Sequence, residues 1–113
     1  IVQVLRNLIS NAISFSPVNG TIWLEISLTD TIVKIHIIDE GPGLQPGTEE
    51  SVFDRFYRER PKNEKFGIHS GLGLSISQQI IMAHGGNIRA KNLCDNVGKI
   101  SGACFMVELP KGY

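Results

Sequence analysis

Polar and apolar residues in the first fourteen positions are segregated with a helical period. Apolar side chains stand at positions 1, 5, 8, 9 and 12, and polar ones at positions 3, 6, 7, 10, 11 and 14. This spacing gathers each kind on one face of a helix. The next segment, 16–20, is dense in turn formers (SPVNG), so the predicted helix ends near Phe15.

Two pairs of later segments have the β-branched, partly alternating composition of strands. The first pair, 21–29 and 32–38, is separated by two polar residues and predicts a β-hairpin. The second pair, 87–91 and 103–109, is separated by a longer polar stretch. We expect all four segments to share one sheet.

A second helix is predicted for residues 75–84, between a glycine-rich start at 71–74 and a glycine C-cap at Gly85. Residues 51–58 are aromatic and basic, and they are predicted to make one or two helical turns with their aromatics buried. Residues 59–70 are polar, mixed in charge and broken by proline and glycine. That composition is typical of a long loop, either a surface excursion or a lid that orders over a ligand.

Composition limits the possible classes. The 113 residues, 42% of them hydrophobic, are enough for one domain with a single core. Eleven basic and eleven acidic residues give a net charge of zero, so nothing general favours nucleic acid or an anionic membrane. No apolar run approaches the roughly eighteen residues that span a bilayer, and no signal segment opens the chain. We expect a soluble domain, and the absence of an initiating Met predicts a fragment truncated at its N-terminus.

The cysteines and two of the histidines are interpreted as structural. Cys94 and Cys104 could face each other across a hairpin, but two thiols make no disulfide framework, so reduced cysteines are expected. Their spacing and the lack of nearby histidine argue against a zinc site. His36 alternates with apolar neighbours on a solvated strand face, and His84 suits the C-terminal end of a helix dipole.

Two amides four residues apart, Asn7 and Asn11, are the most unusual feature of the first helix. Apart from Arg6 the polar stripe there is uncharged, although asparagine is about 0.6 kcal/mol poorer than alanine in a helix. An amide oxygen is a hard neutral ligand suited to Mg²⁺, and its NH₂ group can donate to phosphate. The alternative is that both amides face solvent or cap a neighbouring loop.

Two glycine-containing segments are candidates for contacts with a ligand. Asp39 ends a predicted strand, and Gly41 and Gly43 after it allow a tight bend and a close approach of backbone to a ligand. An ordinary turn would use the same residues, and Pro46 argues against a dinucleotide-binding fingerprint. The 71–74 segment could present backbone N–H groups to phosphate, although it contains no Walker motif.

The order of these motifs carries a resemblance to a known family. The segments LRNLISNAISFSP, DEGPGL, FDRFYR and GLGLSI occur in that order, with AHGG and GACFMVELP after them. Together they resemble the N box, first glycine box, F box and second glycine box of bacterial sensor histidine kinases. This ATP-binding catalytic domain belongs to the superfamily that includes the ATPases of DNA gyrase, mismatch repair and heat-shock chaperones.

The resemblance implies a fold and covers nearly the whole chain. The expected fold class is α+β, a two-layer α/β sandwich. Its mixed, mostly antiparallel sheet would be covered on one face by about three helices and accompanied by a long ATP lid. The chain is then one ATP-binding catalytic domain, residues 1–113.

The resemblance also assigns roles to residues. Asn11 would coordinate the Mg²⁺ that bridges the ATP phosphates, with Asn7 on the same side, and Asp39 would accept a hydrogen bond from the adenine amino group. Arg58 would stabilise charge on the γ-phosphate. The remaining predicted nucleotide contacts are Phe15, Gly41, Gly43, Ser70, Gly71, Leu72, Gly73 and Leu74.

Two positions depart from the pattern of many family members, and a third separates this chain from other branches of the superfamily. Ser14 and Phe15 stand where many members have Lys and Tyr, which removes one cationic phosphate contact and one hydroxyl. Asn7 stands where the gyrase-like and chaperone-like branches carry a glutamate base. The resemblance therefore favours phosphoryl transfer to a protein nucleophile over ATP hydrolysis.

The implied partners lie outside this chain. His36, His69 and His84 lack the flanking residues of the family's acceptor helix, so the acceptor belongs to an upstream dimerisation and histidine-phosphotransfer domain. A response regulator receiver domain would accept the phosphoryl group next. The full-length protein is expected to be a homodimer and an inner-membrane sensor, with this domain cytoplasmic and contacting neither membrane nor nucleic acid. The alternatives are a degenerate nucleotide sensor without kinase activity and a serine kinase of the anti-sigma-factor type.

Overall fold

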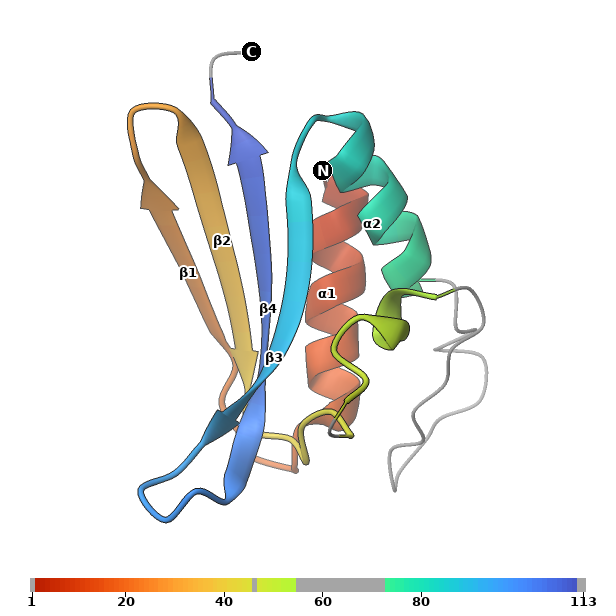
Figure 1. Cartoon of the computed structure of the whole chain (residues 1–113). Helices are drawn as coiled ribbons and strands as arrows, with labels where there is room; N and C mark the ends of the chain where they lie inside the picture. The colour runs from red at the N-terminus through yellow and green to blue at the C-terminus, as the bar shows by residue number, and fades with distance from the viewer. Residues whose placement is uncertain (1, 46, 55–72, 112–113) are drawn as a thin grey trace.

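The computed structural model describes residues 2–45, 47–54 and 73–111. The described part contains two α-helices, one 3₁₀ turn and four strands (Figure 1). In chain order these are α1 (Val2–Phe15), β1 (Trp23–Leu28), β2 (Ile32–Asp39), η1 (Ser51–Phe53), α2 (Gly73–Ala83), β3 (Asn87–Cys94) and β4 (Ile100–Pro110).

The four strands form one sheet in the order β1-β2-β4-β3, and every described pair is antiparallel. Both helices lie on the same face of this sheet (Figure 1). The predicted α+β sandwich is confirmed, with two α-helices and η1 standing for the three expected helices. The parallel pair that a mixed sheet requires is not found among the described strands.

The core lies between the sheet and the helices. Alternate residues of the central strands point into it, and Phe105 of β4 packs edge-to-face against Phe53 of η1 with ring centroids 6.2 Å apart. Such aromatic pairs add to the free energy gained by burial. The largest fully buried side chains are Phe105, Leu8, Ile37, Ile81, Val4, Val107, Cys104 and Ser77.

The two helices form where the sequence predicts them. In α1 the buried positions are Val4, Leu8 and Ala12, one stripe at helical spacing. The end of α2 is a glycine cap, because Gly85 adopts a φ of 79° and the N–H of Gly86 donates to the carbonyl of Ile81 at 2.9 Å.

Some element boundaries differ from the prediction. β1 is shorter than the predicted 21–29, whereas β3 and β4 both extend into the polar stretch that separates them. Backbone pairing across the β3–β4 hairpin continues through residues whose side chains give no strand pattern. Only Ser51–Phe53 of the predicted 51–58 helical segment is described as a helical turn. The loop prediction for 59–70 lies outside the described residues.

The edge strand β1 has no helix over it. Leu24 and Ile26 stand directly opposite Ile37 and Ile35 of β2 and so share their face of the sheet. Ile37 is fully buried, but Leu24 is 48% and Ile26 is 61% exposed. The helices therefore cover the β2, β4 and β3 part of the sheet and leave β1 outside the core.

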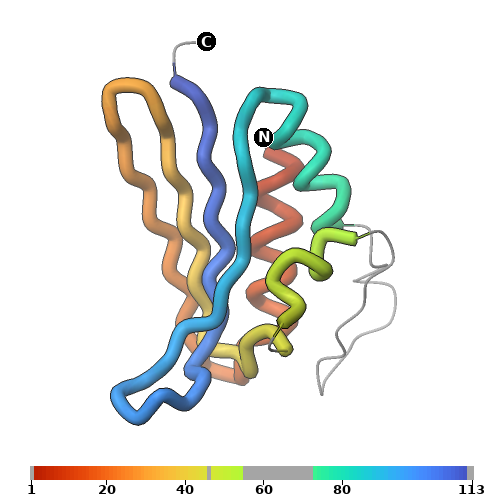
Figure 2. The backbone as a smooth tube through the Cα atoms, viewed as in Figure 1, coloured from red at the N-terminus to blue at the C-terminus, as the bar shows by residue number. Residues whose placement is uncertain are grey.

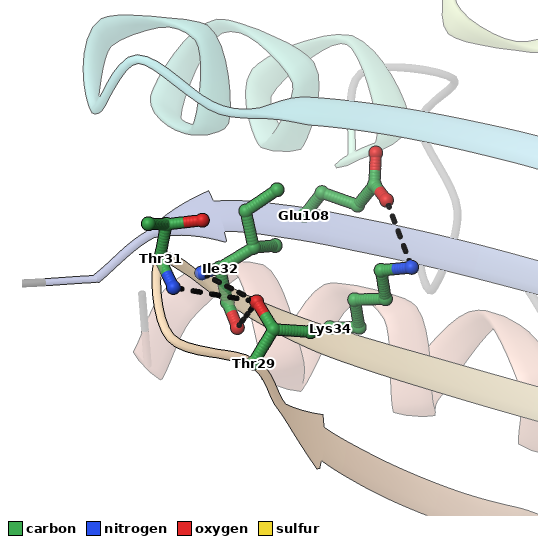
Figure 3. A network of polar contacts seen from close by, with 5 residues as sticks. All are labelled: Thr29, Thr31, Ile32, Lys34 and Glu108. Carbon is green, nitrogen blue, oxygen red and sulfur yellow. Dashed lines mark hydrogen bonds and ion pairs between the residues drawn. The ribbon is translucent and has the colours of Figure 1, made fainter.

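A group of polar contacts lies at and near the β1–β2 turn, at the end of the sheet away from Asp39 (Figure 3). The Thr29 hydroxyl accepts a hydrogen bond from the N–H of Ile32 at 3.0 Å. Lys34 pairs with Glu108 on the neighbouring strand at 3.8 Å, and both side chains are partly exposed. An exposed ion pair of this length adds little to stability.

Both cysteines are free, as expected. Their strand register keeps them apart, since Cys94 stands opposite Ile100 and Cys104 stands opposite Lys91. Cys94 is exposed and Cys104 is buried, and burial raises the pKa of the Cys104 thiol. The suggestion that the two thiols face each other across the hairpin is therefore wrong.

Candidate functional site

Asp39 is a buried acid at the end of β2, with only 3% of its surface exposed. Its Oδ1 atom accepts a hydrogen bond from the N–H of Gly41 at 2.8 Å. Burial raises the pKa of the Asp39 carboxyl, and hydrogen bonds from the backbone N–H groups of Gly41 and Ala103 oppose this shift. A buried carboxylate with spare acceptor capacity can select a ligand that offers an N–H donor.

Close backbone contacts surround this acid, and glycine makes them possible. A Cβ atom on Gly41 would stand 2.5 Å from the carbonyl oxygen of Phe15, the last residue of α1. A Cβ atom on Gly102 would overlap the carbonyl oxygen of Asp39 itself. In Figure 2 the yellow segment after β2 accordingly passes close to the C-terminal end of α1. The Asp39 loop is thus fixed between α1 and β4.

The other end of this loop is held by Asn92 of β3, a residue that the sequence reasoning missed. Its Oδ1 atom accepts a hydrogen bond from the N–H of Leu44 at 2.6 Å, and its Nδ2 atom donates to the Leu44 carbonyl at 2.8 Å. Asn92 falls in the stretch predicted as a loop. Extending the alternation of Ile88 and Ala90 by one step would have placed it on the helix side of the sheet.

Asn7 links the two helices. Its Nδ2 atom donates to the carbonyl of Gly73 and to the hydroxyl of Ser77, both at 3.3 Å. The Ser77 hydroxyl in turn donates to the Gly73 carbonyl at 2.8 Å. The predicted N box and the start of α2, 66 residues apart in sequence, are therefore adjacent in space, as Figure 1 shows for the two helices.

Asn11 lies one turn further along α1 and is half-buried. No hydrogen bond connects its side chain to another residue in the described part of the chain. Its amide oxygen is therefore left available to a ligand. The described residues hold no cluster of three or more His, Cys, Asp or Glu side chains.

The predicted site residues thus fall into two groups along α1. Asn7 and Gly73 form one group, and Phe15 and the Asp39 loop form the other. Asn11 lies midway between them along the helix, four residues from Asn7 and four from Phe15. From Asn7 to Phe15 the helix rises about 12 Å, which is eight residues at 1.5 Å each. That separation suits an elongated ligand with chemically different ends.

The remaining predicted residues are placed as follows. Gly73 and Leu74 open α2, and the Leu74 side chain packs against the core, which leaves only its backbone for a ligand. Gly43 has a φ of 78° and holds the Asp39 loop in a conformation that favours glycine. Arg58, Ser70, Gly71 and Leu72 lie outside the described residues, so their roles stay predictions.

The whole chain, residues 1–113, matches the family described as histidine kinase-, DNA gyrase B- and HSP90-like ATPase. This chain belongs to that family. The ChvG sensor protein of Rhizobium meliloti (strain 1021) is 47% identical over 111 residues. The match covers 97% of this chain and 19% of ChvG, so the chain spans about a fifth of that relative's length.

Solved structures agree with this assignment. A mycobacterial sensor histidine kinase, MprB, superposes with a TM-score of 0.80 at 30% identity, over 96% of this chain and 68% of that one. The histidine kinase ThkA, solved in complex with the response regulator TrrA, gives a TM-score of 0.74 at 32% identity, over 97% of this chain and 28% of that one. The resemblance inferred from the ordered boxes is confirmed at the level of family and fold.

Proposed function

We propose that this domain binds Mg-ATP along α1 and provides the γ-phosphoryl group for transfer to a histidine of another domain. The single observation that carries the proposal is the placement of two different chemistries at two points of one helix. The buried acid Asp39 lies beside Phe15, and Asn7, the first of the two amides, lies beside the N-terminus of α2. The family match to ATPases supports the choice of ligand.

In this proposal the adenine end of the nucleotide lies at Asp39. The carboxylate accepts a hydrogen bond from the adenine amino group, while Gly41 and Gly43 leave room for the base. The backbone N–H groups of Gly41 and Ala103 use only part of the acceptor capacity of this carboxylate, so the acid can still accept a hydrogen bond from the ligand. A base with a carbonyl in place of the amino group would offer this acid no donor and would place two acceptors against each other, which is unfavourable in a buried site.

The phosphates then lie at the amide pair and the first turn of α2. Backbone N–H groups at a helix start favour anions, and Gly73 begins that helix. Asn11 would hold a magnesium ion together with the phosphate oxygens, which fits an ion that takes few protein ligands of hard oxygen type. The ion would neutralise charge on the phosphates. The Asn11 side chain suits such an ion, because its amide oxygen has no hydrogen-bond partner among the described residues.

Asn7 favours transfer over hydrolysis. An amide cannot act as a general base at neutral pH, so it cannot activate water for attack on the γ-phosphate. Its NH₂ group is also engaged by Gly73 and Ser77. In this proposal neither described histidine is the acceptor: His84 has its Nδ1 atom hydrogen-bonded to the Ile80 carbonyl at 2.7 Å, and His36 lies in mid-strand.

The acceptor, in this proposal, is a histidine on an upstream dimerisation domain of the same protein, and a response regulator receives the phosphoryl group next. The relatives support these partner classes, since they include a sensor protein and a histidine kinase solved in complex with a response regulator. We place the domain on the cytoplasmic side of a homodimeric sensor protein. Among the described residues no helix is long and apolar enough to cross a bilayer.

Calorimetry of the domain with Mg-ATP tests the proposal directly. We expect saturable binding, and we expect Asp39→Asn to weaken it by about a hundredfold, the loss typical of a hydrogen bond to a charged group. Asp30→Asn, in the exposed β1–β2 turn, controls for the removal of one carboxylate. A folded wild-type domain that binds no nucleotide, or an Asp39→Asn variant that binds normally, would contradict the proposal.

A second candidate function is nucleotide sensing without phosphoryl transfer. It is favoured by Ser14 and Phe15, because the latter contacts the Asp39 loop through its backbone but offers no hydroxyl. Joining the domain to its native upstream segment and supplying labelled ATP separates the two functions. Labelled phosphohistidine supports the kinase, whereas nucleotide binding with no label on a folded, dimeric protein supports the sensor.

A further inference from the structure

We propose that Asn92 is a positioning residue for nucleotide recognition, which sets the place of the Asp39 loop without touching the ligand. This inference rests on the proposed function of the site. It adds to that function a residue from β3, a strand that contributes none of the predicted site residues.

The contact is a clasp on the backbone of one residue, Leu44. Asn92 uses both halves of its amide on the backbone of Leu44, at 2.6 Å and 2.8 Å. A bidentate contact fixes both the distance and the orientation of the bonded group. Leu44 is itself buried, with 7% of its surface exposed, so the clasp also satisfies backbone groups that water would reach poorly.

Asn92 and Asp39 belong to one row across the sheet. Asp39 stands opposite Ala103, and Ala103 stands opposite Asn92. The row therefore places the acid and the clasp on the same face of the sheet, two strands apart, with the small side chain of Ala103 between them. The loop leaves the row at Asp39 and returns to it at Leu44.

The loop needs such an anchor because of its own composition. Between Asp39 and Leu44 it contains Gly41 and Gly43, the residues that restrict a backbone least. The hydrogen bond from Gly41 to Asp39 fixes only the first half of the loop. The Asn92 clasp fixes the second half, so that the two contacts together hold the segment that would face the base.

There is little free space around the contact between Asn92 and Leu44. A Cβ atom on Gly43 would stand 2.6 Å from the Asn92 Oδ1 atom and 2.5 Å from a methyl group of Ile100. Only a glycine lets the loop approach Asn92 this closely, and Gly43 has the φ of 78° that glycine accepts readily. Gly43 and Asn92 together therefore set the distance between the loop and the sheet.

The test compares Asn92→Ala with the wild-type domain. Mg-ADP affinity by calorimetry is expected to fall about tenfold, the change expected from losing roughly the net free energy of one hydrogen bond. In the protein joined to its upstream segment, KM for ATP is expected to rise by a similar factor while kcat is unchanged. Poor folding would instead lower the apparent kcat and leave KM unchanged, because it reduces only the amount of active protein.

Two further variants keep the test decisive if alanine unfolds the domain. Asn92→Gln retains both amide functions on a longer side chain and is expected to recover part of the affinity, whereas Asn92→Ser cannot span both Leu44 atoms and is expected to bind as weakly as alanine. Asn87→Ala is the matched control, because Asn87 is an exposed asparagine at the start of the same strand. It should bind Mg-ADP as the wild type does.

A measurement without nucleotide separates this inference from the proposed function. The Leu44 amide should exchange slowly with deuterated solvent in the wild type and faster in Asn92→Ala. If the wild type binds Mg-ADP and folded Asn92→Ala binds it equally well, the positioning role is overturned while the proposed function stands. If the wild type shows the slow Leu44 exchange but binds no nucleotide, the proposed function fails and the positioning role falls with it.

Discussion

The two ends of the proposed nucleotide site are held by contacts of different quality. At the Asp39 end, three hydrogen bonds of 2.6 to 2.8 Å fix the loop, and glycines allow backbones to touch. At the amide end, Asn7 reaches Gly73 and Ser77 only at 3.3 Å, beyond the usual range for an N–H donor. The end proposed for the base is preorganised, and the end proposed for the phosphates is held loosely.

This difference suits the two recognition tasks. Selecting one base requires a donor and an acceptor in fixed places, which short, buried contacts provide. Phosphates are recognised mainly through charge, by a helix N-terminus and a metal ion whose water ligands adapt. We therefore expect substitutions at the Asp39 end to change the stability of the domain more than substitutions at the amide end.

The largest expected effect is that of Gly102→Ala. Its Cβ atom would overlap the Asp39 carbonyl, so the sheet must open beneath the loop, at a cost of about 3 kcal/mol in the free energy of unfolding. Gly73→Ala is the matched substitution at the other end, where a Cβ atom would meet Asn7 only at 3.9 Å. Urea denaturation should show the first variant strongly destabilised and the second unchanged or slightly stabilised. Equal stability of the two variants would contradict the proposed difference between the two ends of the site.

Next in size is the pH dependence contributed by Asp39. Burial raises its folded pKa above the unfolded value, so its contribution to stability is complete below the unfolded pKa of about 3.9 and is lost as pH rises through the folded pKa. The Asp39→Asn variant has no carboxyl to titrate at this position, so it should gain stability relative to the wild type as the pH rises through this range. Thermal unfolding of both proteins at a series of pH values measures the difference. A difference that runs the other way would show that the hydrogen bonds to the carboxylate outweigh its burial.

A smaller effect is expected for Ser77→Ala. The Ser77 side chain is fully buried and connects Gly73 with Asn7, and its loss should cost about 1 kcal/mol of unfolding free energy. Since Asn7→Ala breaks part of the same network, the double variant should lose less than the sum of the two single variants. Ser101→Ala, on an exposed part of β4, is the control. Additive losses would mean that the two helices are not coupled through these groups.

The smallest effect is expected away from both ends. Removing the exposed Lys34–Glu108 pair by Lys34→Met should change stability by less than about 0.5 kcal/mol, and the change should shrink further in high salt. Denaturation of this variant with and without added salt checks the estimate. A loss as large as that of Ser77→Ala would show that this exposed pair contributes as much to the free energy of unfolding as a buried contact does.

Much of this molecule could be read from its sequence. The helical period of α1, the hairpin of β1 and β2 and the glycine cap of α2 are all local patterns, and each element forms where its pattern predicts. The ordered boxes identified the family, because motif order survives even where single motifs are weak. The ends of β3 and β4 were missed because strand pairing depends on a partner backbone and not on the side chains of either strand alone.

By itself, then, the sequence determined most of the elements and the family, and it predicted Asp39, Asn7 and Asn11 as site residues. Only the tertiary structure decided which distant residues support them. Asn92 lies 48 positions from Leu44, and nothing in its neighbouring sequence marks it, because its partner is the backbone of a distant residue that the fold brings to it. Likewise the contact between Asn7 and Ser77 exists only because two helices pack on one face of a sheet.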